Sequence, residues 1–299
     1  MIELVMRGMP CLDAPTYLAV AGLTRALEPQ GARVQFEDVT PVLVLPDGLG
    51  TREVADLVAA EVVRATHGQG AELPWPVPQA STLREVLNPW LREQWQGNDE
   101  LFSVDVGTKL VDKTKTDRCS TATRFSTAVN SSMGPGMLNH VLRDLRPEGR
   151  KAAAEAAVFD DQVLGWVGDH IERVLEGGMP IPVRREKSML GYSPLSTRAP
   201  DRHTGDPVVL EVTEMLAALA ITHLAPRGRL PGLPGGRWFW WWLNPAPMGW
   251  ESLRALGRRT WVPGLVGYRS SMRSLGGSMD KYYEFGPVEE MAVSRKMRR

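Results

Sequence analysis

Residues 14–27, with the sequence APTYLAVAGLTRAL, restrict the possible fold more than any other stretch of this chain. The stretch predicts a helix with little side-chain bulk, and its one charged residue is Arg25. Ala19, Gly22 and Ala26 stand at i, i+3 and i+7, so they lie on one face of that helix. Small residues on one face let a neighbouring sheet or helix approach closely. The sequence therefore predicts a buried helix with a close-packed neighbour on its Gly22 side.

The residues around this helix alternate between strand and helix patterns. The expected elements are strands over 2–8, 33–40 and 41–46, with a turn at Thr40-Pro41, and a helix over 52–65 capped by Thr51. Such alternation favours an α/β or α+β fold, in which an N-terminal mixed sheet carries packed helices.

The second half of the chain has longer helical patterns and one aromatic strand. Helices are predicted over 149–176, with Gly177-Gly178 as the stop, and over 208–224. Residues 238–242 predict a strand whose alternate rings pack inward. We expect an acidic N-terminal region over 1–150 and a helical, basic and aromatic C-terminal region over 151–299. These two regions form either separate units or one compact unit.

Charge is balanced over the whole chain but distributed unevenly. There are 35 Lys and Arg against 35 Asp and Glu, yet residues 1–100 hold 7 basic and 14 acidic side chains. Residues 225–275 hold eight arginines and one acid, Glu251. Such asymmetry indicates an anionic partner for the basic part. A solvated, arginine-rich surface remains the alternative.

A second basic stretch lies over residues 107–136. It is rich in Ser and Thr, ends in Gly-Pro-Gly, and has too few apolar residues for a core element, so we expect a long loop or a pair of edge strands. Hydroxyls beside basic side chains are typical of phosphate contacts. The candidate contacts here are Lys109, Lys113, Lys115, Arg118 and Arg124.

The C-terminal arginines are the other candidate nucleic-acid contacts, because arginines interleave there with aromatic residues. The set comprises Arg237, Arg254, Arg258, Arg259, Arg269 and Arg273. The stretch WESLRALGRR predicts a short helix in which Arg254 and Arg258 are four residues apart and share a face with Arg259 beside them.

Signatures of catalysis are missing from the sequence. There is no Gly-x-Ser-x-Gly elbow, no phosphate-binding loop, and no pair of histidines at i, i+4 spacing. We therefore expect no enzymatic activity, no cofactor and no metal. Asp160 and Asp161 are more typical of an exposed charge pair than of a metal site.

Two alternatives remain open. One is a motif-poor hydrolase or transferase that uses His203 and Asp206, or the Ser/Thr-rich stretch 107–136. The other is an interaction protein with no nucleic-acid role.

The chain also carries signals about its compartment. The first residues, MIELVMRGMP, lack the apolar run of a signal peptide, and no apolar run reaches the roughly 18 residues of a membrane span. Cys11 and Cys119 are the only cysteines, which suits a reducing environment. We expect a cytoplasmic protein without a membrane contact.

Several stretches together resemble a known family. They are APTYLAVAGLTRAL followed by VQFEDVTPVLVLPDG, the mid-chain TRFSTAVNSSMGPGMLNHVL, the aromatic WFWWWLNPAPMGWESLRALG, and RSLGGSMDKYYEF. This pattern is similar to Cascade large subunits of type I CRISPR systems, and most of all to the short Csb-type large subunit of subtype I-G, formerly I-U. The Cys-rich finger of some large subunits has no counterpart here.

The resemblance implies a non-catalytic subunit of an antiviral ribonucleoprotein complex. Such a subunit contacts the end of the guide RNA and the other Cascade subunits, and it inspects the short motif (PAM) that flanks the target in double-stranded DNA. It also helps to recruit the helicase-nuclease. The basic regions would then face nucleic acid, and the acidic first hundred residues would face basic protein partners or solvent.

Overall fold

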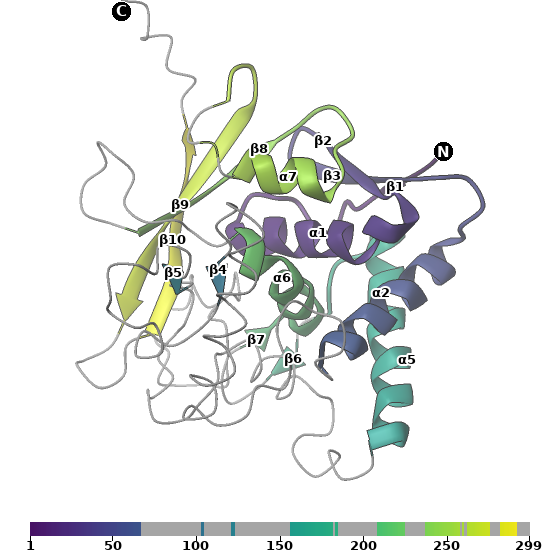
Figure 1. The fold of residues 1–299 in the computed structure, drawn as a ribbon. Coiled ribbons are helices and arrows are strands. Elements are labelled where there is room, and N and C mark those ends of the chain that lie inside the picture. The colour runs from purple at the N-terminus through teal and green to yellow at the C-terminus, as the bar shows by residue number, and fades with distance from the viewer. Residues whose placement is uncertain are drawn as a thin grey trace, which may run out of the picture.

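The computed structural model describes residues 1–66, 103–104, 121–122, 156–181, 183–184, 208–224, 237–257, 259, 262–275 and 282–291. These residues form helices packed with antiparallel sheets (Figure 1), which confirms the α+β alternative. Side chains at both ends of the chain contribute to one hydrophobic core.

The N-terminal sheet consists of β1 (Ile2–Val5), β2 (Arg33–Glu37) and β3 (Thr40–Leu45), in the order β1-β3-β2. Both pairings are antiparallel, so β1 and β2 run in the same direction with β3 between them. Helix α1 (Ala14–Ala26) connects them, which makes a split β-α-β unit. The sheet is thus antiparallel in its pairings rather than mixed.

The turn between β2 and β3 lies at Asp38-Val39, and the expectation of a turn at Thr40-Pro41 was wrong. Glu37 pairs directly with Thr40, which leaves a two-residue connection. Asp38 has a φ of 57°, in the left-handed region that tight hairpins require and that Asp tolerates better than most residues. A two-residue hairpin forces the antiparallel pairing of β2 and β3.

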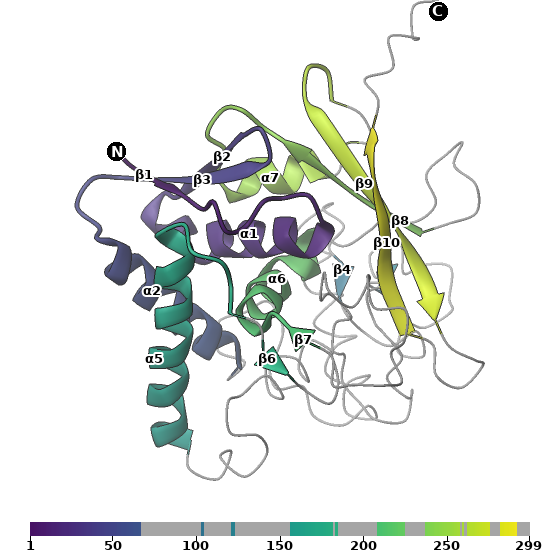
Figure 2. The same ribbon diagram turned by 180° about the vertical axis from the view of Figure 1, so that it is seen from behind.

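Helix α1 is the central element of the molecule. Every residue from Ala14 to Thr24 is buried, because α1 lies between α7 and the N-terminal sheet on one side and α6 on the other (Figures 1 and 2). Asp13 caps its N-terminus by accepting a hydrogen bond from the Thr16 N–H at 2.7 Å.

The predicted close approach on the Gly22 side occurs against α6 (Glu211–Leu224). A Cβ placed on Gly22 would lie 1.8 Å from the carbonyl oxygen of Leu216, so only hydrogen fits there. Next to it, the Arg25 guanidinium donates to the carbonyl of Leu219 and stands over the Trp250 ring, 6.0 Å from its centroid. Arg25 therefore links α1 to both α6 and α7.

Helix α2 (Thr51–Thr66) packs along α5 (Ala156–Leu175) at the edge of the molecule. Helix α2 begins at Thr51 itself, and the Glu53 carboxylate accepts from the Gly50 N–H at 2.9 Å, so Gly50 takes the capping position expected for Thr51. Helix α5 ends as predicted at the glycine pair: Gly177 has a φ of 85°, and the Gly178 N–H donates to the Arg173 carbonyl at 2.8 Å.

A second sheet contains β8 (Arg237–Leu243), β9 (Val266–Leu275) and β10 (Tyr282–Met291), in the order β10-β9-β8 with antiparallel pairs. Strands β9 and β10 were not predicted. Helix α7 (Trp250–Gly257) follows β8. Between them, residues 244–248 pair with the free edge of β2: Val34 and Met248 exchange two hydrogen bonds of 2.9 Å.

Shorter elements complete the described part of the chain. They are η1 (Glu28–Gln30), the parallel pair β4 (Ser103–Val104) and β5 (Thr121–Ala122), and the antiparallel pair β6 (Val183–Arg184) and β7 (Val208–Val209). Strand β7 and helix α6 occupy the range expected to be a single helix over 208–224.

An aromatic cluster joins α1 to both sheets. The Tyr17 ring lies 6.1 Å from Phe36 of β2 and 6.1 Å from Trp241 of β8, and Trp241 in turn stacks on Tyr268 of β9 at 5.8 Å. The Trp241 indole N–H donates to the Cys11 carbonyl at 3.2 Å. Burial raises the pKa values of both Tyr17 and Cys11, so both stay neutral in this core.

Gly22→Ala tests the helix contact. The added methyl group would collide with the backbone of α6, so we expect a loss of about 1–3 kcal/mol in the free energy of unfolding. Gly165→Ala on α5 is the matched control, because a Cβ there meets nothing within 4 Å and helix propensity alone should stabilise by up to about 1 kcal/mol. Chemical denaturation of both variants measures the difference, and equal stabilities would contradict the contact.

Asp13→Asn tests the cap through its pH dependence. Burial raises the pKa of Asp13, and the hydrogen bonds from Thr16 offset part of that increase. As the pH rises above about 3.9, the pKa of Asp in the unfolded chain, ionisation of Asp13 therefore lowers the free energy of unfolding. This loss is still present at pH 7. Asn keeps the capping oxygen without the charge, so Asp13→Asn should melt above wild type at pH 7 and converge with it below about pH 4. Asp13→Ala should lose about 1 kcal/mol at low pH, where the charge is absent. A wild-type advantage over Asn that grows with pH would contradict this account.

Candidate nucleic-acid interface

The described structure includes three of the eleven predicted contact side chains: Arg254, Arg259 and Arg269. Two more, Arg237 and Arg273, belong to β8 and β9, but the structure describes only their backbone. The remaining six lie outside the described residues: Lys109, Lys113, Lys115, Arg118, Arg124 and Arg258. The same holds for His203 and Asp206, and for the side chains of Asp160 and Asp161 in α5.

Helix α7 holds Arg254 beside Glu251, as their spacing predicts. The two side chains form an ion pair of 3.0 Å one turn apart on the helix. Helix α7 ends at Gly257, however, so Arg259 lies beyond the helix and does not extend its face, while Arg258 lies outside the described residues. Glycine is a weak helix former, and the Arg259 N–H turns back to the Leu256 carbonyl at 2.9 Å.

Arg259 combines a fixed backbone with an exposed side chain. Its carbonyl accepts a hydrogen bond of 2.9 Å from the indole N–H of Trp242 on β8. No residue in the described part of the chain forms an ion pair with its guanidinium. The guanidinium of Arg259 is therefore exposed to solvent, while a hydrogen bond holds the backbone of this residue in place.

Arg269 lies in the centre strand of the second sheet and is paired. Its Nε and Nη2 lie 2.9 and 2.7 Å from the same oxygen, Oε2 of Glu289 on β10. The strand register also places Glu284 opposite Arg273. The charge count over residues 225–275 did not include Glu284 and Glu289, because both follow that range in the sequence. The β9–β10 pairing places them opposite the arginines.

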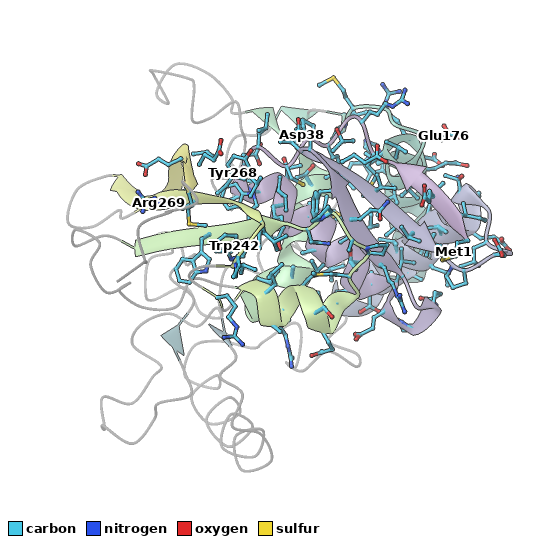
Figure 3. All side chains as sticks on the ribbon, turned by 90° about the horizontal axis from the view of Figure 1, so that it is seen from above. Met1, Asp38, Glu176, Trp242, Tyr268 and Arg269 are labelled. Atoms are coloured by element: carbon cyan, nitrogen blue, oxygen red, sulfur yellow. The ribbon has the colours of Figure 1, made fainter. Side chains whose placement is uncertain are left out.

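The two faces of β8 differ in their neighbours. Phe239, Trp241 and Leu243 belong to the main core, which agrees with the expected alternation. Trp240 and Trp242 lie on the other face and are also buried, at 6% and 2% exposure. Opposite Trp242 stands Gly267, where a Cβ would lie 2.5 Å from the indole ring. Figure 3 shows Trp242 and Tyr268 on opposite sides of these strands.

Acidic side chains gather on the helix pair at the other side of the molecule. Figure 3 shows Glu176, which follows α5, far from Arg269. Arg52 of α2 holds this pair together: it reaches Asp169 at 2.6 Å and Glu172 at 3.2 Å on α5, and Asp56 on its own helix at 2.9 Å. The hydrogen bond to Asp169, followed by that to Glu172, raises the pKa of this guanidinium.

The described part contains no group of three or more His, Cys, Asp and Glu side chains placed to hold a metal ion. No described helix combines the length and the apolar character needed to cross a membrane.

Comparisons with protein-family models, with curated proteins and with solved structures find no match to this chain.

Trp242→Phe tests how Arg259 is held. The substitution removes the indole donor to the Arg259 carbonyl, whereas Trp240→Phe removes an indole N–H that has no acceptor among the described residues. Both changes delete the same volume from the same face. Trp242→Phe should therefore cost about 0.5–1.5 kcal/mol more in unfolding free energy than Trp240→Phe. An equal or larger loss in Trp240→Phe would show that the hydrogen bond does not hold the segment.

Proposed function

We propose that this chain is a non-catalytic, nucleic-acid-binding large subunit of a type I CRISPR ribonucleoprotein surveillance complex. Its partners in this proposal are the end of the guide RNA, double-stranded target DNA, other Cascade subunits and the helicase-nuclease. The chain would inspect the motif flanking the target, and base pairing with the guide RNA would supply the remaining specificity.

One observation carries the nucleic-acid part of this proposal. Arg259 is exposed on a tethered backbone, within a segment that holds eight arginines and one acid. Guanidinium groups bind phosphate oxygens through paired N–H donors, and a fixed backbone lowers the entropy lost on binding. The partner assignments come from the sequence resemblance to Cascade large subunits.

The acidic helix pair α2–α5 fits the same proposal. Its carboxylates would repel nucleic acid, so binding should orient the molecule with the second sheet and α7 toward the phosphates. A basic protein neighbour in the complex would then contact the helix pair.

Arg258→Ala combined with Arg259→Ala tests phosphate binding. The full chain would be titrated with labelled duplex DNA over a range of salt concentrations. If each arginine contacts one phosphate, the slope of log K against log salt should become shallower by about 1.8, for all DNA sequences. Arg7→Ala combined with Arg33→Ala is the matched control, because it removes two exposed arginines from the N-terminal region. An unchanged slope in a folded Arg258/Arg259 variant, or an equal change in the control, would contradict the proposed contacts.

Co-purification tests the assignment to a ribonucleoprotein complex. The chain, expressed with its genomic neighbours, should purify with other subunits and with short RNA of uniform length. Recovery of the chain alone, free of RNA, would contradict membership of such a complex.

A further inference from the structure

Strand β10 places acidic residues opposite arginines of β9. Glu289 pairs in register with Arg269, and Glu284 pairs with Arg273. Both arginines are among the predicted nucleic-acid contacts. Because directly opposed residues of an antiparallel pair share a face, Trp240, Arg269 and Glu289 form one row across the sheet, on the side away from the Trp241–Tyr268 stack.

The contact between Arg269 and Glu289 uses the groups that a phosphate would use. Two guanidinium nitrogens converge on one carboxylate oxygen at 2.9 and 2.7 Å. Arginine binds carboxylate and phosphate with the same fork of N–H donors. The side chains are 28% and 49% exposed, so this ion pair is accessible to solvent and to a ligand.

We propose that Glu289 is an intramolecular competitor, which occupies Arg269 until a nucleic-acid phosphate displaces it. This inference rests on the proposed nucleic-acid-binding function and adds a regulatory contact to it. Exposed ion pairs contribute little stability, so displacement of Glu289 costs little while its charge still lowers the affinity of the site. Competition of this kind selects against weak, isolated anions and in favour of a polyanion that engages several arginines at once.

Glu289→Gln and Glu290→Gln form a matched pair for the test. Glu290 is the next residue of β10, and it is exposed and stands opposite Tyr268 rather than Arg269. Both substitutions remove one negative charge, so their long-range effects on a polyanion are alike. We expect the full chain carrying Glu289→Gln to bind labelled duplex DNA about two- to five-fold more tightly than the chain carrying Glu290→Gln.

The same pair in an Arg269→Ala background completes the cycle. With the arginine removed, the two Gln variants should bind DNA equally, because nothing is left to compete for. In the chain that retains Arg269, equal DNA affinities of the Glu289→Gln and Glu290→Gln variants would overturn this inference and leave the proposed function standing. Absence of DNA binding at low salt, in both the wild type and Glu289→Gln, would contradict the inference and the proposed function together.

Discussion

The rest of the structure depends on the contact between the backbones of α1 and α6. Gly22 lies against the Leu216 carbonyl so closely that no side chain fits between them. The glycine hydrogen that a Cβ would replace points toward that oxygen, a geometry in which weak C–H···O hydrogen bonds form between helices. Since α1 also supports both sheets through Tyr17, this one contact fixes how residues from the two ends of the chain meet.

The aromatic cluster connects helix α1, and so its contact with α6, to the proposed interface. Tyr17 stacks on Trp241, and the neighbouring Trp242 faces the other way and holds the Arg259 carbonyl. The core therefore positions the backbone of an arginine whose side chain is exposed. On the adjacent strands, Arg269 is held by Glu289. Within the proposed function, these two arginines differ in kind, because one is open to phosphate and the other has a competitor.

The sequence predicted the features that depend on residues close together in the chain. The small face of residues 14–27, the glycine stop of α5 and the aromatic strand β8 all follow from spacing within a few residues. Strands β9 and β10 were missed, although Val266, Tyr268 and Ser270 alternate before the Gly276-Gly277 pair. The Glu289–Arg269 pair could not be foreseen, because its register depends on a bulge between Phe285 and Val288. The turn at Asp38-Val39 was missed because the proline of Thr40-Pro41 is the stronger local turn signal.

Native-state hydrogen exchange tests the central position of α1 most directly. A helix buried along its length and locked to α6 should open only when the whole molecule unfolds. We therefore expect the amides from Leu18 to Thr24 to exchange with the free energy of global unfolding, and those of the peripheral helix α2 to exchange with a lower one. Exchange of the α1 amides through a local opening, at a lower free energy than those of α2, would contradict the account.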